Sequence, residues 1–221
     1  MWRSLSVAVM VLYHAAYDLA LFGRLDMAVF DCRPLRAVRY AVAVSFVVIS
    51  GAASRFSRST ARRGFTVFCA GFAVTAATSL AGMPVAFGIL QLIGASMLIS
   101  SLQARRLQSA RGALMPLLCA AAHFSMLALC RSVRVSAKWL YPLGLRYPGF
   151  YSADYYPLLP WVPVFLFGIW LGGVLERNAE RSPPGRCCPP ALTFAGRHAL
   201  AIYLVHQPVL YGLCLLLLRK D

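Results

Sequence analysis

A histidine and an aspartate, His14 and Asp18, stand one helical turn apart inside the first apolar stretch of the chain. Ionisable side chains within a membrane-spanning segment are costly unless they pair or face a polar cavity. A carboxylate four residues after a histidine can accept its ring N–H, fix its tautomer and raise its basicity. The other ring nitrogen can then take a proton from a nucleophile. The spacing therefore predicts His14 as a general base and Asp18 as its orienting group, although a purely structural polar pair stays an alternative.

Other apolar stretches bring polar side chains to a similar depth, if each helix rises about 1.5 Å per residue. Gln91 is one of them, and we add it to the candidate catalytic residues because its estimated depth matches that of Asp18. Further polar side chains are expected in the same outer half, where they could border the site: Asp154, Tyr155, Trp161 and His206. Ordinary alternatives stay open, since aromatic side chains gather at membrane interfaces and a lone histidine can hydrogen-bond a neighbouring helix.

Four arginines crowd the connection between the second and third apolar stretches: Arg55, Arg58, Arg62 and Arg63. Guanidinium groups bind phosphate oxygens in a bidentate fashion, so this cluster predicts a site for the phosphates of a nucleotide-like donor. The alternative is a topology signal that contacts anionic lipid.

The composition is that of an integral membrane protein. With 60% hydrophobic residues, 13% charged residues and a mean hydropathy of +0.67, the 221 residues are too apolar for a soluble core. The net charge of +15 does not indicate nucleic acid, because the basic residues fall between apolar runs. Cys187 and Cys188 have no second ligand pair at a suitable spacing, so no metal site is predicted. His14 and Asp18 interrupt the first run, which we expect to be a retained helix and not a cleaved signal peptide.

Seven stretches approach the roughly 20 residues needed to cross a bilayer. They are residues 4–22, 37–54, 64–81, 85–102, 113–130, 158–175 and 198–218. We therefore expect an all-α, polytopic helix bundle that forms a single transmembrane domain over residues 1–221. The distribution of arginine and lysine favours a cytoplasmic N-terminus. His123 is expected to be an ordinary core histidine, and a homo-oligomer through faces rich in alanine and glycine is left open.

Five runs resemble, in order and spacing, the bacterial relatives of the heparan-alpha-glucosaminide N-acetyltransferase catalytic domain. They are YHAAYDL at 13–19, ISGAAS at 49–54, FGILQLIG at 87–94, DYYPLLPW at 154–161 and GRHALAIYLVHQP at 196–208. The similarity covers nearly the whole chain. It departs from many members at Gln91, where they carry a histidine, and a glutamine cannot act as a base near neutral pH.

The resemblance implies an acyltransferase that takes an acyl group, usually acetyl, from cytoplasmic acyl-coenzyme A such as acetyl-CoA. The acceptor would be a sugar or glycan on the far side of the membrane, modified by N- or O-acylation. By this analogy His14 and Asp18 serve the acceptor group, the motif around Asp154 and Trp161 holds the sugar, and the basic loops hold coenzyme A. The expected partners are the lipid bilayer, acyl-CoA and the glycan, and the expected location is the inner (cytoplasmic) membrane.

Two other functions remain open from the sequence. Intramembrane histidine and aspartate could relay protons or bind a polar substrate in a transporter or flippase, although no inverted repeat is visible. A non-catalytic relative of the same family is the second alternative.

Overall fold

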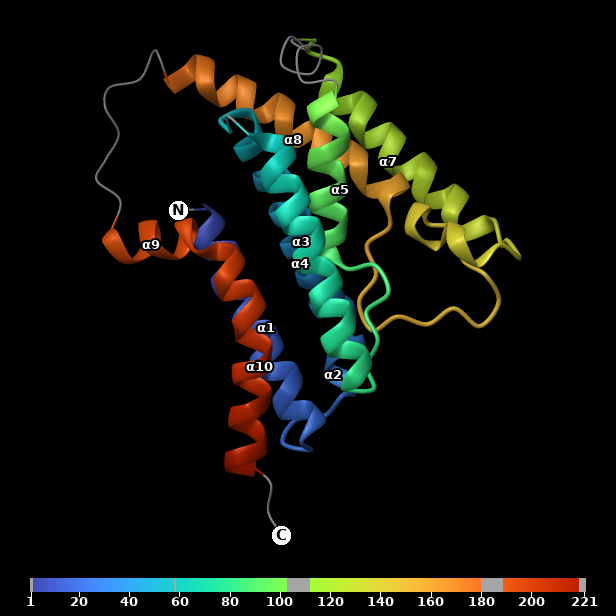
Figure 1. Cartoon of the computed structure of the whole chain (residues 1–221), viewed down its shortest axis with the longest axis vertical. Helices are drawn as coiled ribbons and strands as arrows, with labels where there is room; N and C mark the ends of the chain where they lie inside the picture. Colours follow the sequence, from blue (N-terminus) through green and yellow to red (C-terminus); the bar gives the residue numbers. More distant parts are fainter. Residues whose placement is uncertain (1, 58, 103–111, 180–188, 219–221) are drawn as a thin grey trace. The chain divides into compact units, whose positions relative to one another are not determined.

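The computed structural model describes residues 2–57, 59–102, 112–179 and 189–218. Of the residues singled out above, Arg58, Cys187 and Cys188 lie outside these ranges. The helices are α1 (Trp2–Leu21), α2 (Ala28–Asp31), α3 (Arg33–Arg55), α4 (Thr60–Leu80), α5 (Ile89–Leu102), α7 (Met115–Ser132), the 3₁₀ helix η1 (Lys138–Leu143), α8 (Leu158–Ala179), α9 (Pro190–Arg197) and α10 (Ala199–Leu218) (Figure 1).

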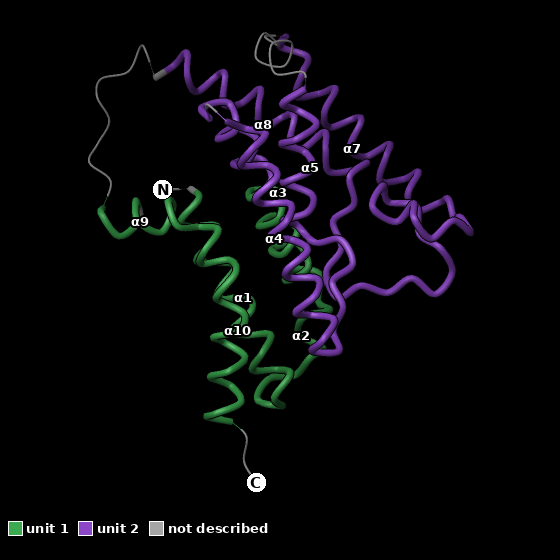
Figure 2. The backbone as a smooth tube through the Cα atoms, in the orientation of Figure 1, with its two compact units in different colours: residues 1–46, 185–221 green, residues 47–184 purple. Residues whose placement is uncertain are grey.

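The all-α membrane fold is confirmed. Within the described ranges, six helices are long and apolar enough to cross a membrane, namely α1, α3, α4, α7, α8 and α10. The remaining predicted span, α5, has 14 residues and is shorter. The chain divides into two compact units, residues 1–46 with 185–221 and residues 47–184, so that α3 begins in unit 1 and ends in unit 2 (Figure 2).

In unit 1, α1 and α10 pack side by side and run in the same direction (Figure 1). The direction follows from three side-chain pairs that occur in the same order along both helices: His14 with His206, Asp18 with Gln207, and Phe22 with Tyr211. The apolar core of this unit is formed by Val7, Met10 and Ala199, packed against Val11, Val42, Phe46, Ile202 and Tyr203. Apolar contacts thus hold the first halves of both helices together. The polar pairs lie about one turn further along the same interface.

In unit 2, α4 packs against α5 and α7 packs against α8. The second half of α3 lies against α8, where glycines let the two backbones approach closely. A methyl group added to Gly51 would meet the carbonyl oxygen of Phe165, and one added to Gly168 would meet the carbonyl oxygen of Val48. Such close approach of small residues is a common way for helices to associate in membranes.

Helix α5 begins four residues later than the start predicted at residue 85, and the correction has a clear cause. Residues 84–88 are not helical, and their backbone bonds at two points to the end of the connection between α7 and α8. The backbone N–H of Ala153 donates to the Pro84 carbonyl oxygen at 3.0 Å, and that of Tyr156 donates to the Phe87 carbonyl oxygen at 2.9 Å. An apolar segment satisfied in this way gains its hydrogen bonds without becoming helical.

Gly168→Ala is expected to destabilise unit 2, although alanine normally favours a helix over glycine by about 1 kcal/mol. The added methyl group meets the Val48 backbone, and overpacking of a tight contact typically costs about 1–3 kcal/mol. The unfolding temperature of the purified protein in detergent should therefore fall. The matched control is Gly212→Ala in α10, because nothing lies within 4 Å of its added carbon. Equal effects of the two substitutions would contradict the proposed packing.

Candidate functional site

Four polar side chains meet on the facing sides of α1 and α10 within unit 1: His14, Asp18, His206 and Gln207. The rings of His14 and His206 lie edge to face with their centroids 5.0 Å apart. Gln207 Nε2 donates a hydrogen bond of 2.9 Å to Asp18 Oδ1. Asp18 is 1% exposed, so its carboxylate is buried. The His14 and Asp18 pair predicted from spacing therefore has a matching pair on α10.

Backbone carbonyl groups hold both histidine rings. The Nδ1 atom of His14 lies 2.9 Å from the Met10 carbonyl oxygen, and the Nδ1 atom of His206 lies 2.6 Å from the Tyr203 carbonyl oxygen. A carbonyl oxygen only accepts, so each Nδ1 carries the proton and each Nε2 presents a lone pair. The ring N–H of His14 thus donates to its own helix and not to Asp18 as expected. Asp18 retains an electrostatic interaction with His14.

Three buried atoms of this cluster have no hydrogen-bond partner among the described residues: Asp18 Oδ2, His206 Nε2 and Gln207 Oε1. With the carboxylate ionised and His206 protonated on Nδ1, all three are acceptors. Buried acceptors that stay unsatisfied are costly, so such a group favours a ligand that supplies several N–H or O–H donors. We call His14, Asp18, His206 and Gln207 the α1–α10 polar cluster.

A proline adjoins the α1–α10 polar cluster. Pro208 lies inside α10, directly after Gln207, and has no backbone N–H. The carbonyl oxygen of Leu204, four residues earlier, therefore lacks its usual helical donor. This adds one more acceptor on the turn of α10 that carries His206 and Gln207.

In unit 2, Gln91 links two helices and is 1% exposed. Its Nε2 donates to Thr75 Oγ1 on α4 at 2.7 Å, and its Oε1 accepts the backbone N–H of Gly88 at 2.7 Å. A methyl group on Gly71 would lie 2.7 Å from the Gln91 side chain, so a glycine is needed for the close approach. These contacts stabilise the α4–α5 pair and the start of α5.

Of the predicted substrate-binding residues around the start of α8, Trp161 is buried, and Asp154 and Tyr155 are partly buried. Trp161 is 6% exposed and its indole contacts Tyr156 and His123. The Tyr155 hydroxyl donates to the Tyr141 carbonyl oxygen at 2.6 Å, and burial raises the pKa of this phenol above its usual value. Asp154 precedes them and accepts a hydrogen bond from Ser152 through its backbone oxygen.

His123, expected to be a core histidine, is confirmed as one. It is 4% exposed and its Nδ1 bonds to the Pro160 carbonyl oxygen, which ties α7 to the first turn of α8.

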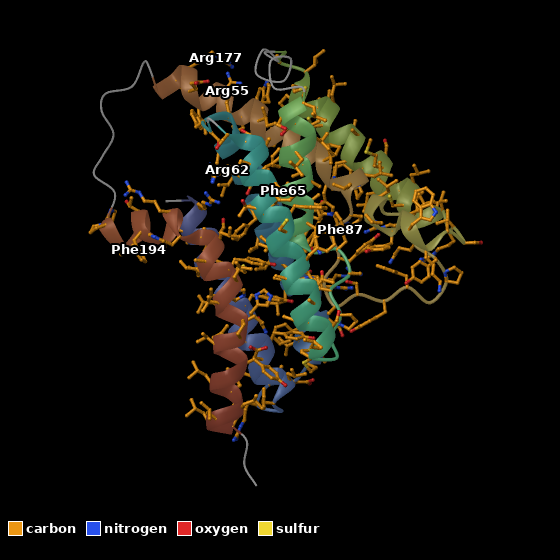
Figure 3. All side chains as sticks on the ribbon, viewed as in Figure 1. Arg55, Arg62, Phe65, Phe87, Arg177 and Phe194 are labelled. Carbon is orange, nitrogen blue, oxygen red and sulfur yellow. The ribbon has the colours of Figure 1, made fainter. Side chains whose placement is uncertain are left out.

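The described arginines of the basic connection differ in their surroundings. Arg55 Nε forms an ion pair of 2.7 Å with Glu176 Oε2, joining the end of α3 to α8. Arg62 and Arg63 are exposed on the first turn of α4. Arg55 lies near Arg177 of α8 at one end of unit 2, and Phe87 lies toward the other end (Figure 3).

The structure thus places the predicted residues in separate groups. His14, Asp18 and His206 meet in unit 1, whereas Gln91, Tyr155 and Trp161 belong to unit 2. Gln91 and Tyr155 are linked through the segment before α5. Gln91 bonds to Gly88 of that segment, and the neighbouring Phe87 pairs with Tyr155. Two partners were not predicted as site residues, Gln207 and Thr75. An amide directly after a histidine in an apolar run is the signal that could have identified Gln207.

Comparison with known proteins gives one family. The family described as heparan-alpha-glucosaminide N-acetyltransferase, catalytic, matches residues 1–208. The match includes the α1–α10 polar cluster and all of unit 2. Searches of the curated proteins and of the solved structures gave no match.

We expect Asp18 and Gln207 to be energetically coupled. Gln207→Ala leaves a buried carboxylate oxygen without a donor and should cost about 1–3 kcal/mol of unfolding free energy. Asp18→Ala should cost less in a Gln207→Ala background, with a coupling of about 0.5–3 kcal/mol. Reversible unfolding of the four proteins of this cycle in detergent measures the coupling. Additive losses would show that the hydrogen bond contributes nothing to stability.

Proposed function

Because the chain belongs to the heparan-alpha-glucosaminide N-acetyltransferase catalytic family, we propose that it transfers an acyl group, most simply acetyl, from cytoplasmic acyl-coenzyme A to a sugar or glycan acceptor. The family and the six long apolar helices make the chain a multi-pass membrane acyltransferase. The donor, the acceptor side and the inner-membrane location are the parts that we propose. The observation that carries the proposal is the α1–α10 polar cluster, in which His14 is fixed with a lone pair on Nε2.

His14 acts as the general base. Its Nε2 takes the proton from an acceptor hydroxyl or amine as that group attacks the thioester carbonyl carbon. The C–S bond then breaks, the acceptor keeps the acyl group, and the proton held by His14 passes to the leaving thiolate of coenzyme A. The carboxylate of Asp18, one turn away, stabilises the imidazolium that forms between these two steps.

The acceptor is held by the remaining atoms of the same cluster. His206 Nε2, Asp18 Oδ2 and Gln207 Oε1 are buried acceptors, and a sugar offers several hydroxyl donors on one ring. Asp154, Tyr155 and Trp161 remain proposed acceptor-binding residues of unit 2. Gln91, which cannot serve as a base, supports the α4–α5 pair through its contacts with Thr75 and Gly88.

Arg62 and Arg63 are the proposed contacts for the phosphates of coenzyme A, since both guanidinium groups are exposed. Arg55 contributes by anchoring the end of α3 through its ion pair with Glu176, close to where this basic connection starts. Arg58 belongs to the same proposal and lies outside the described residues.

Mass spectrometry of cell-envelope sugars, from cells with and without this protein, tests the proposed function. Loss of one acyl group from a defined sugar would support it. Movement of a sugar across membrane vesicles without consumption of acetyl-CoA would instead favour a transporter.

His14→Ala should abolish transfer, because general-base catalysis typically contributes about 100- to 10,000-fold in rate. The assay follows labelled acetyl from acetyl-CoA into the glycans of isolated membranes. His198→Ala is the control, since His198 is exposed directly after α9 and its ring Nδ1 bonds to the Phe194 carbonyl oxygen of that helix. Turnover in His14→Ala equal to that of the control would rule out His14 as the base.

Replacing both Arg62 and Arg63 with glutamine should raise the KM for acetyl-CoA by about tenfold or more, with little change in kcat, because charge-assisted bonds to phosphate are lost. The control is Arg24→Gln, because Arg24 is an exposed arginine that follows α1 and is not among the proposed donor contacts. If the KM of the double variant matches that of the control, these arginines do not bind the donor.

A further inference from the structure

Two arginines stand side by side in the connection between α7 and α8. Arg134 and Arg146 are paired across a short parallel bridge, and the backbone N–H of Val135 donates to the Arg146 carbonyl oxygen at 3.2 Å. Paired positions of neighbouring extended segments carry their side chains on the same face. Two like charges held in this way repel each other, so the arrangement is unfavourable unless an anion lies between them.

These charges have no acidic partner among the described residues. The ion pair among the described residues joins Arg55 to Glu176, and neither residue belongs to this connection. Arg146 is half-buried and lies close to the partly buried phenol of Tyr155. Lys138 adds a third positive charge, with its Nζ 5.8 Å from the centre of the Tyr147 ring. The connection therefore carries three basic side chains and a single acidic one, Asp154.

A packed aromatic group keeps the three cations in place. Phe150 stacks on Tyr141 with ring centroids 5.7 Å apart, and it also contacts Tyr147 and Tyr155. The turn after η1 depends on Gly144, whose φ of +114° disfavours other residues. The charged residues thus project from a folded segment and not from a loose loop. Such a fixed arrangement lowers the entropy cost of binding an anion.

The same segment lies next to the membrane. It joins two helices long enough to span a bilayer, α7 and α8. Trp139 is 74% exposed and Tyr151 is 69% exposed, and exposed aromatic side chains at the ends of spans lie at the level of lipid headgroups. A phosphate in that layer would be within the reach of arginine side chains on the same segment.

We propose that Arg134, Lys138 and Arg146 form a binding site for the phosphate of an anionic phospholipid. Guanidinium groups bind phosphate oxygens through two parallel N–H bonds, and a neighbouring ammonium adds a third contact. Trp139 and Tyr151 border the site and contact the lipid around the headgroup. The site is separate from the α1–α10 polar cluster and does not depend on the proposed acyl transfer.

The test measures lipid binding by the full-length protein in neutral detergent. Native mass spectrometry counts bound phosphatidylglycerol and phosphatidylcholine, and unfolding temperatures are recorded with each lipid. The wild type should prefer phosphatidylglycerol, and Arg134→Gln or Arg146→Gln should each weaken that binding by about fivefold, the worth of one basic residue near an anionic surface. The double variant should lose the preference.

The matched control is Arg131→Gln, which removes an exposed charge from the last turn of α7 but leaves the bridge pair intact. It should keep the preference for phosphatidylglycerol. An equal loss in Arg131→Gln would mean that only the general surface charge attracts lipid, which would overturn the proposal.

Two more measurements separate a forked contact from simple charge attraction, and a lipid from a free phosphate. Arg134→Lys and Arg146→Lys keep the charge without the forked geometry, so they should fold normally and lose only part of the affinity; wild-type affinity in both would refute the forked contact. Inorganic phosphate serves as the soluble probe. If it raises the unfolding temperature as much as phosphatidylglycerol does at equal concentration, the ligand is a free phosphate and the lipid assignment is wrong.

Discussion

A carboxylate placed between two helices inside a bilayer must find its hydrogen-bond donor within the protein, because lipid offers none. Here the donor is the amide of Gln207, and its bond to Asp18 Oδ1 fixes how α10 is rotated against α1. That rotation brings His206 against His14, with both Nδ1 atoms held by backbone carbonyl groups. This hydrogen bond therefore helps to set how His14, Asp18, His206 and Gln207 are arranged in unit 1.

Unit 2 is organised by a different constraint, the close approach of backbones. Gly51 and Gly168 allow α3 to lie directly on α8, and Gly71 leaves room for the Gln91 side chain between α4 and α5. Gln91 then satisfies the first backbone N–H before α5 and a hydroxyl of α4. A glutamine can make both contacts at once because its amide carries a donor and an acceptor. At this position the residue type suits a structural link at least as well as a chemical step.

Much of the helical fold could be predicted from hydropathy, because long apolar runs have few alternatives to a spanning helix. The start of α5 could not, since the apolar segment before it bonds to a distant connection and not to itself. His14 and Asp18 were recognisable as a site because both are ionisable in an apolar run. Their actual contacts could not be predicted. Any helical histidine can donate to the carbonyl oxygen four residues earlier, as His14 does. The bond between Gln207 and Asp18 depends on how two helices that are distant in the sequence face each other.

The common direction of α1 and α10 limits how the chain can be threaded through a bilayer. If α1 and α10 both cross the membrane in the same direction, the number of crossings from α1 to α10, with both included, must be odd. The six long apolar helices of the described ranges make an even number. Parity is restored if α5, with its 14 residues, also crosses, which brings the number to seven and agrees with the sequence-based expectation. A helix of about 21 Å, at 1.5 Å per residue, is shorter than the hydrocarbon layer. The non-helical residues 84–88 must then supply part of that crossing inside protein and not in lipid. The first residue of α1 and the last residue of α10 then face opposite compartments.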